Sequence, residues 1–188
     1  MSTTKTQRIG IWIIAVVLAV GTIGSFFVII LANDNGQKDQ EAAQKQYQQQ
    51  LDAYKKLQEE ARKANKPLDG YSVAKFDTDS VKDLKVETLK QGNGAVLKSD
   101  STITANYFGW TSDGSIFDST NKNGKVTPAE FSLAQVIKGW TKGLTGQKVG
   151  STVKLTIPAD QAYGSTDDGS GRPVGPLVFI VEIKDVKK

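Results

Sequence analysis

Apolar and polar residues alternate along much of the second half of the chain, and this pattern predicts β-strands. In the stretch STITANYF, for example, Ile103, Ala105 and Tyr107 fall on one face and mostly polar residues on the other. Dipeptides such as Asn-Gly and Asp-Gly separate the alternating stretches and mark turns. Strands are expected over residues 84–89, 101–108, 151–157 and 177–186, and one short helix around residues 135–144. Together they predict an α+β fold, in which an antiparallel sheet curls over the helix.

Residues 37–66 follow a different pattern and are rich in Gln, Ala, Lys and Glu, which favour helices. Their apolar members recur every three or four residues and form one narrow stripe, made of Ala43, Tyr47, Leu51, Tyr54, Leu57, Ala61 and Ala64. Two interpretations stay open: a solvated helical stalk, which we favour, and a short coiled-coil seam that holds a weak homodimer. Pro67 and Gly70 are expected to end the helix.

Residues 9–32 contain no charged side chain and are long enough to cross a hydrocarbon core of about 30 Å as a helix. A cleaved signal peptide is the alternative, but its apolar region is usually only about 7–15 residues long. We therefore expect a single-pass anchor in the cell membrane. Lys5 and Arg8 precede it, so the positive-inside bias places the N-terminus in the cytoplasm. The expected parts are cytoplasmic residues 1–8, transmembrane residues 9–32, a stalk or linker over residues 33–67, and an extracytoplasmic domain over residues 68–188.

The composition narrows the chemistry that this domain can perform. The chain has no histidine and no cysteine, which excludes Ser-His-Asp triads, thiolate catalysis and disulfides. Its net charge of +4 is not concentrated in a basic patch, so we expect no nucleic-acid partner. It contains no phosphate-binding loop, dinucleotide fingerprint or metal-loop spacing, so we expect neither a metal nor a cofactor. Any chemistry of this domain must therefore use carboxylates, hydroxyl groups, aromatic rings, backbone groups or apolar surface.

Three short stretches combine large aromatic rings with polar groups or glycine in a way that a core does not require. They are GSIFDS, with Phe117 before Asp118; QVIKGW, with Trp140 after Gly139; and AYG, with Tyr163 in loop-like sequence. We interpret Gly139 as leaving a bare, flat floor beside the indole ring. A sheet curled over a helix that begins at Trp140 would enclose a hollow for a small apolar group.

The same residues resemble those of FKBP-type peptidyl-prolyl cis-trans isomerases. The resemblance rests on NYFGWTSDGSIFDST, FSLAQVIKGWTKGLTGQKVGSTVKLTIPADQAYG and GPLVFIVEI, which lie in the right order within about residues 84–186. It implies a half-barrel of antiparallel sheet around one short helix, and rotation of X–Pro bonds without a cofactor. It also implies proline-containing polypeptides as substrates and macrolide inhibitors of that family as further ligands. With the expected anchor, it suggests a role in folding extracytoplasmic proteins.

The resemblance assigns roles to individual residues. The catalytic positions fall on Tyr107, Phe117, Asp118 and Tyr163, and the substrate-binding positions on Val136, Ile137, Trp140 and Phe179. Trp140 would lie under the proline ring, and Tyr163 would donate a hydrogen bond from the far wall. Asp118 has two candidate roles, orienting Tyr107 or acting on the twisted carbonyl.

The chain also departs from that family. The loop GSTDDGSGRPVGP lacks the apolar residue expected before its prolines, Gln135 stands where an acidic residue is frequent, and Ala129 where an aromatic residue is common. Because this loop would contact the substrate, a second function stays open, a peptide-binding or chaperone module with little turnover. A third also stays open, in which the stalk dimerises the protein and the domain is a spacer in an envelope assembly.

Overall fold

The computed structural model describes residues 37–187. It divides the chain into two compact units, Met1–Ala61 and Arg62–Lys188. Within the described residues, no helix is long and apolar enough to span a membrane. The anchor expected over residues 9–32 and the cytoplasmic segment expected over residues 1–8 lie outside the described residues.

The helix predicted from the Gln- and Ala-rich pattern is confirmed as α2 (Gln37–Ala64). Arg62 and Lys63 lie in its last turn, where positive charge interacts favourably with the helix dipole. The next residues form the short strand β1 (Asn65–Lys66) instead of another helical turn. The reason is tertiary: Asn65 pairs with Lys122 of a distant strand, and this pairing outweighs the local helix preference.

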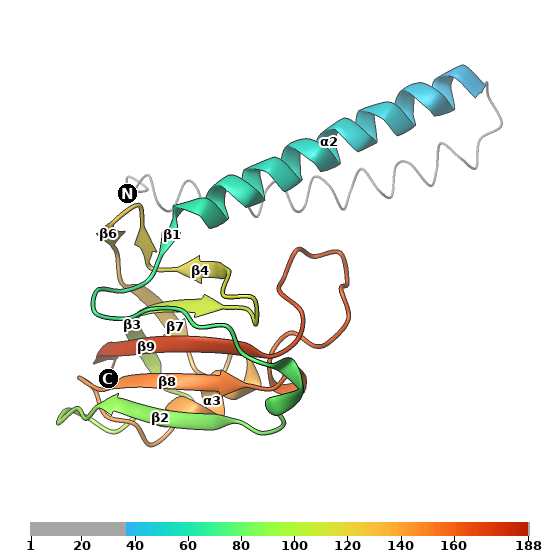
Figure 1. The fold of residues 1–188 in the computed structure, drawn as a ribbon. Helices are drawn as coiled ribbons and strands as arrows, with labels where there is room; N and C mark the ends of the chain where they lie inside the picture. The colour runs from blue at the N-terminus through green and yellow to red at the C-terminus, as the bar shows by residue number, and fades with distance from the viewer. Residues whose placement is uncertain (1–36, 188) are drawn as a thin grey trace. The chain divides into compact units, whose positions relative to one another are not determined.

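A six-stranded antiparallel sheet forms the centre of the second unit (Figure 1). Its order is β2-β8-β9-β3-β4, and β7 pairs with the remaining part of the β3 edge. The strands are β2 (Lys85–Lys90), β3 (Thr102–Trp110), β4 (Ile116–Ser119), β7 (Ala129–Ser132), β8 (Thr152–Ile157) and β9 (Leu177–Val186). The four predicted strands are thus confirmed as β2, β3, β8 and β9, while β4 and β7 were not predicted.

A second, three-stranded sheet joins β1 to the hairpin of β5 (Asn121–Lys122) and β6 (Lys125–Val126). The Asn-Gly turn signal is confirmed here, because Asn123 and Gly124 connect β5 to β6 with φ angles of 53° and 85°. Positive φ at both central residues is typical of the tight hairpin turn whose twist matches that of the flanking strands. Two 3₁₀ turns, η1 (Thr78–Ser80) and η2 (Ala159–Gln161), lie in the connecting segments.

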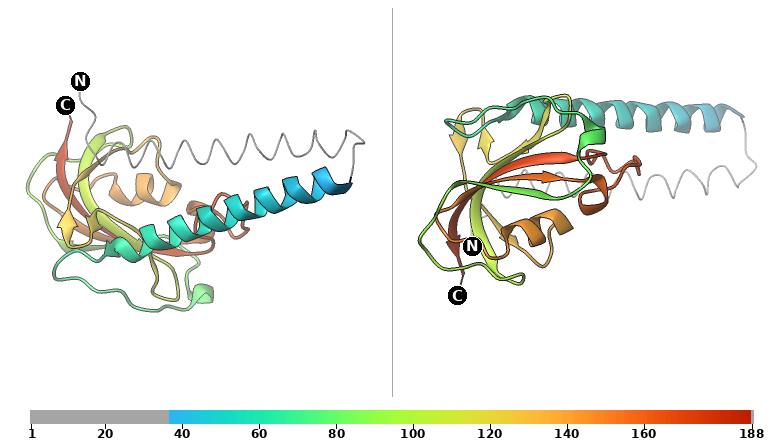
Figure 2. Two further views of the ribbon diagram at one scale, coloured as in Figure 1. Left: turned by 90° about the horizontal axis from the view of Figure 1, so that it is seen from above. Right: turned by 60° about the horizontal axis from the view of Figure 1, so that its bottom comes forward.

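Apart from the end of α2, the only α-helix described in the second unit is α3 (Lys138–Leu144), which packs on the inner face of the sheet (Figure 2). It begins at Lys138, two residues before the Trp140 start expected from the sequence. A Cβ on Gly139 would lie 2.4 Å from Ile157 Cγ2 on β8, so glycine is required where the helix meets the sheet. The interpretation of Gly139 as a bare pocket floor is therefore wrong. An antiparallel sheet around one short helix, as the resemblance implied, is confirmed.

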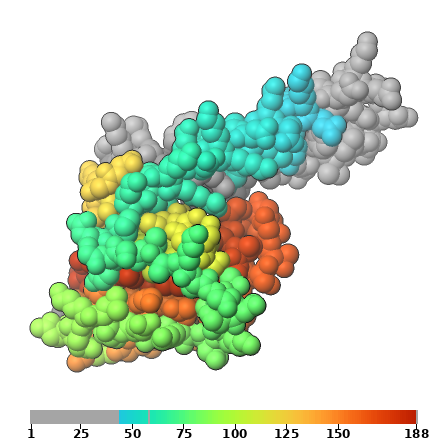
Figure 3. Space-filling model, in the orientation of Figure 1, coloured from blue at the N-terminus to red at the C-terminus, as the bar shows by residue number. Residues whose placement is uncertain are grey.

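The outer face of the sheet carries a second apolar cluster. Alternation along β3 and β9 sends Phe108, Trp110, Val178 and Ile180 to this face, where Leu68 packs on them. Residues further along the segment after β1 complete the cover, namely Tyr71, Val73 and Phe76. Figure 3 shows this segment lying across the sheet, with parts of β8 and β9 still visible beside it. The sheet is thus packed on both faces, and only the inner one carries the pocket with the aromatic floor described below.

Candidate active site

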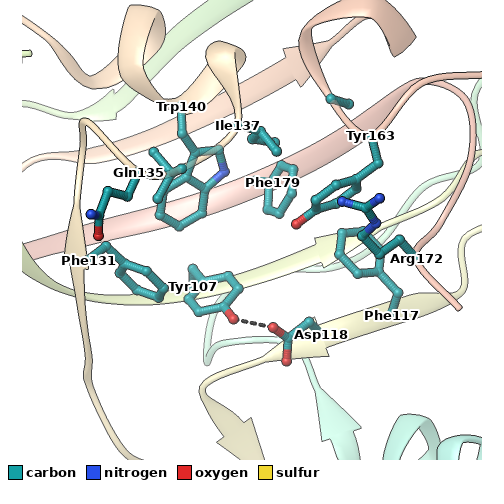
Figure 4. Close-up of a pocket in the computed structure, with 12 residues that line it drawn as sticks. Tyr107, Phe117, Asp118, Phe131, Gln135, Ile137, Trp140, Tyr163, Arg172 and Phe179 are labelled. Atoms are coloured by element: carbon teal, nitrogen blue, oxygen red, sulfur yellow. Dashed lines mark hydrogen bonds between the residues drawn. The ribbon is translucent and has the colours of Figure 1, made fainter. Parts of the chain in front are cut away.

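A pocket of about 480 Å³ lies on the inner face, between the sheet, the N-terminal end of α3 and two loops (Figure 4). This volume is within the range of small-ligand sites. Its lining consists of Tyr107, Phe117, Asp118, Phe131, Gln135, Val136, Ile137, Trp140, Ala162, Tyr163, Arg172 and Phe179. All eight residues that the sequence assigned to a site are among them, so the fold brings them together. What each does to a substrate stays a prediction.

Trp140 is the floor of the pocket and is fixed by three other rings. The centroid of its indole lies 5.3 Å from Tyr107, 5.2 Å from Phe131 and 5.4 Å from Phe179, with interplanar angles of 86°, 65° and 86°. Edge-to-face contacts of this kind are the favoured arrangement of aromatic pairs. Phe131 is not among the residues that the sequence assigned to the site, but it both supports Trp140 and lines the pocket. These contacts make the floor rigid.

A β-bulge in β4 directs two consecutive side chains to the pocket. Gly109 of β3 is opposite Asp118, while Trp110 is opposite Ile116, so Phe117 is an extra residue on its strand. In a regular strand, successive side chains point to opposite faces, and a bulge breaks this rule. Phe117 and Asp118 can therefore both line the pocket, as Figure 4 shows. The sequence motif placed them next to each other without showing how both could face a ligand.

Gly109 is a residue of this site that sequence reasoning missed. A Cβ at this position would lie 2.5 Å from Cε1 of Phe179 and 2.7 Å from Cζ of Phe117. These two rings meet edge to face, with centroids 5.5 Å apart, over the space that the glycine leaves. The available signal was a glycine inside an otherwise regular strand pattern, which marks a close approach.

The polar wall of the pocket is a hydrogen-bonded pair of Tyr107 and Asp118. The Tyr107 hydroxyl donates to Asp118 Oδ2. The second carboxylate oxygen, Oδ1, accepts from the Ser119 backbone N–H at 2.8 Å and from Lys122 Nζ at 3.0 Å. Burial, and after it the nearby Asp118 charge, raises the pKa of Tyr107 well above its ordinary value. Tyr107 therefore stays a neutral donor at neutral pH, and it holds the carboxylate in place.

Strand β1 supports this wall from the side of the preceding segment. The Asn65 side-chain oxygen accepts from Lys122 Nζ at 2.5 Å, and the Lys66 carbonyl accepts from Ser119 Oγ at 2.7 Å. Lys122 and Ser119 are the two groups that also bind Asp118 Oδ1. The domain start expected at Leu68 leaves β1 outside the domain, whereas the compact unit begins at Arg62. A strand of two residues has no periodicity by which the sequence could reveal it.

Comparison with known proteins places this pocket in a family. The sequence profile described as "FKBP-type peptidyl-prolyl cis-trans isomerase" matches residues 94–184. FK506-binding protein 1 of Dictyostelium discoideum is 37% identical over 103 residues, which are 53% of this chain and 94% of that protein. The chain belongs to the FKBP-type peptidyl-prolyl cis-trans isomerase family. The membership covers the part of the chain that builds the pocket.

Two bacterial FKBP relatives are longer than the matched part. "Outer membrane protein MIP" of Legionella longbeachae is 42% identical over 108 residues, which are 56% of this chain and 45% of that protein. FkpA of Escherichia coli K12, an FKBP-type peptidyl-prolyl cis-trans isomerase, is 39% identical over 104 residues, which are 55% of this chain and 38% of that protein. The chain thus aligns with less than half the length of each of these two relatives.

The remaining wall of the FKBP-type pocket comes from the loop after η2. Tyr163 is 37% exposed, and burial, followed by the Asp118 charge, raises the pKa of its hydroxyl while the Arg172 charge opposes this. The Arg172 guanidinium lies 5.5 Å from the centre of the Tyr163 ring. Sequence reasoning gave no role to Arg172 or Ala162, and singled out Gln135 only as a departure, yet all three line the pocket. Among residues 37–187, no group of acidic side chains could hold a metal ion.

Proposed function

We propose that this protein is an active peptidyl-prolyl cis-trans isomerase that acts on proline-containing polypeptides. The observation that carries the proposal is the pocket itself. A rigid indole floor, with Phe117 and Phe179 beside it, forms a small apolar hollow with polar groups only at its walls. Such a hollow suits the ring of a proline and the bond that precedes it.

The reaction needs no group that forms or breaks a covalent bond. Rotation about a peptide C–N bond has a barrier of about 18–20 kcal/mol, because the twisted state loses the partial double-bond character of the planar amide. Water stabilises the planar, charge-separated amide through its oxygen. An apolar pocket removes that water and favours the twisted state, in which the charge separation is smaller. This chemistry suits a chain without histidine or cysteine.

Polar groups at the walls would hold the peptide on either side of the bond. Tyr163 and Ile137, the N-cap residue of α3, both line the pocket, and in this proposal the Tyr163 hydroxyl and the Ile137 backbone N–H would donate to flanking carbonyl groups. Asp118, fixed by Tyr107, would act on the twisted carbonyl or keep the wall in shape. A thousandfold acceleration requires about 4 kcal/mol. Desolvation together with one or two hydrogen bonds can supply this amount.

Exchange spectroscopy by NMR on a peptide with one Ala-Pro bond tests the activity without a coupling protease. The full chain in nonionic detergent should increase the cis-trans exchange rate in proportion to enzyme concentration. A rate equal to that in buffer, together with line broadening that shows binding, would instead identify a peptide-binding module.

We further propose that residues 9–32 anchor the protein in the cell membrane and that the isomerase domain assists folding outside the cytoplasm. The uncharged run and the preceding Lys5 and Arg8 support this orientation. The name of the Legionella relative, an outer membrane protein, supports an envelope location. Proteolysis of the domain by protease added outside intact cells would confirm it, and full protection would contradict it.

The stalk helix offers a route to a weak homodimer, which we also propose. Its stripe of Tyr47, Leu51, Tyr54 and Leu57 is only partly covered, and Leu57 is 58% exposed. A dimer would remove this surface from water. Sedimentation of the full chain against a variant with Leu51→Gln and Leu57→Gln tests the idea, and equal masses would contradict it.

A further inference from the structure

The charged groups that line the pocket are an acid on one wall and a base on the other. Asp118 stands on the β4 side, where it is engaged by Tyr107 and Lys122. Arg172 stands on the loop side, and its side chain is 53% exposed. The Gly175 N–H donates to the Gly164 carbonyl at 2.8 Å and closes the base of this loop.

Contacts on three sides hold the Arg172 guanidinium at the pocket wall. It lies 5.5 Å from the centre of the Tyr163 ring, a cation–π distance. Its Nε donates to Ser170 Oγ at 2.8 Å, and Nη2 donates to Asp168. An arginine has five N–H donors in a planar fork. The described residues accept from two of them, so the fork is oriented and still has donors to offer.

The pair with Asp168 does not remove Arg172 from use by a ligand. Asp168 is not part of the pocket lining, and its side chain is 52% exposed. Exposed ion pairs contribute little, since water competes for both partners. A carboxylate that arrives in the pocket can therefore add to this pair or replace Asp168.

We propose that Arg172 makes the pocket prefer substrates with an acidic side chain directly beside the proline, a specificity that rests on the proposed isomerase function. Tyr163 and Arg172 line the same side of the pocket, which in the proposed complex would meet the residues that flank the proline. Arg172 lies against that ring, so a Glu side chain one residue from the proline can reach the guanidinium. The loop residues before Arg172, 164–171, are polar or glycine, and Val174 after it is 44% exposed but does not line the pocket. The loop therefore offers little apolar surface to a bulky apolar residue in the pocket.

Matched peptides that differ only in charge test this proposal with the full chain in nonionic detergent. The peptides are acetyl-Ala-Xaa-Pro-Ala-amide and acetyl-Ala-Ala-Pro-Xaa-amide, with Xaa as Glu or Gln, and the readout is kcat/KM from NMR exchange. We expect Glu to exceed Gln roughly two- to fivefold in at least one series at low salt. The preference should shrink in 0.5 M salt, where the screening length for charges falls to roughly 4 Å.

Variants then assign the preference to Arg172. Arg172→Gln should bring the Glu/Gln ratio to about one, whereas Asp168→Asn should raise it by removing the competing carboxylate. Lys142→Gln is the matched control, because it removes one positive charge from an exposed position of α3 that does not line the pocket. Equal rates for Glu and Gln in the wild type, or a preference that survives Arg172→Gln, would overturn the proposal. If the Gln peptides were not accelerated either, the isomerase function itself would fail.

Discussion

Trp110 and Trp140 have the same exposure but opposite surroundings. Each is 3% exposed, and each packs against other aromatic rings, on opposite faces of one sheet. Trp110 stacks on Phe108 with centroids 5.3 Å apart, and its Nε1 donates to the Ala74 carbonyl at 2.9 Å. Trp140 is held edge-on by three rings, and none of the described residues accepts a hydrogen bond from its Nε1.

The difference shows that two tryptophans of equal burial can differ in their hydrogen-bond partners, so burial alone does not separate a packing residue from one that lines a pocket. A buried donor without an acceptor costs roughly 1–3 kcal/mol, so cores satisfy nearly all of them. On the outer face, the segment that covers the sheet also supplies the acceptor for Trp110. On the inner face, Trp140 has rings around it and an open hollow beside it. Both faces thus carry packed apolar clusters, and the inner face also carries the pocket.

The largest expected difference between the two faces comes from substitutions in β4, because Ile116 and Phe117 are adjacent and pack on opposite faces of the sheet. Phe117→Ala should lower kcat/KM roughly tenfold to a hundredfold, which is the worth of one large apolar contact with the proline ring. Ile116→Ala should leave kcat/KM of the folded protein within about twofold and lower the free energy of unfolding by about 2–3 kcal/mol. Both quantities follow from NMR exchange and urea unfolding of the same samples. Equal losses of activity in the two variants would show that the faces are not independent.

The long strands and the position of the site could be predicted from the sequence. Residues 151–157 alternate, and residues 177–186 form a dense run of apolar and β-branched residues that ends in alternation, so both predicted strands, which became β8 and β9. The motifs around Phe117, Trp140 and Tyr163 were specific enough to assign eight residues to one site, and all eight line one pocket in the structure. In these regions the local pattern and the final fold agree.

The remaining features of the fold and of the site could not be predicted, because they depend on contacts between distant parts of the chain. Strands β4 and β7 have four residues each, too short for a period, and they exist because β3 offers them an edge. The bulge at Phe117 and the need for glycine at Gly109 arise only when two strands are set side by side. Arg172 lies in a loop without any pattern, and only the folded loop brings it onto the Tyr163 ring.

A smaller effect should distinguish the two tryptophans directly. Trp110→Phe removes the donor to Ala74 and leaves that carbonyl without its partner, whereas Trp140→Phe removes a donor that has no partner among the described residues. Both variants lose packing volume, so the comparison isolates the hydrogen bond. Trp110→Phe should therefore destabilise the unit of residues 62–188 by about 1 kcal/mol more than Trp140→Phe in urea unfolding. The reverse order would mean that the indole of Trp140 is bound as firmly as that of Trp110.

The smallest predicted effect is a loss of folding stability at alkaline pH. It arises because burial raises the pKa of Tyr107 in the folded protein. Burial and the Asp118 charge raise the pKa of Tyr107 in the folded state, whereas a tyrosine in the unfolded chain ionises near pH 10. Below that pH both states keep the proton. Above it the unfolded state releases the proton first, so stability falls as pH rises, by about 0.8 kcal/mol at pH 10.5. The stability difference between wild type and Tyr107→Phe should shrink by this amount between pH 8 and pH 10.5. Trp110→Phe changes no titrating group, so its stability difference should be the same at both pH values, and a constant difference for Tyr107→Phe would contradict the raised pKa.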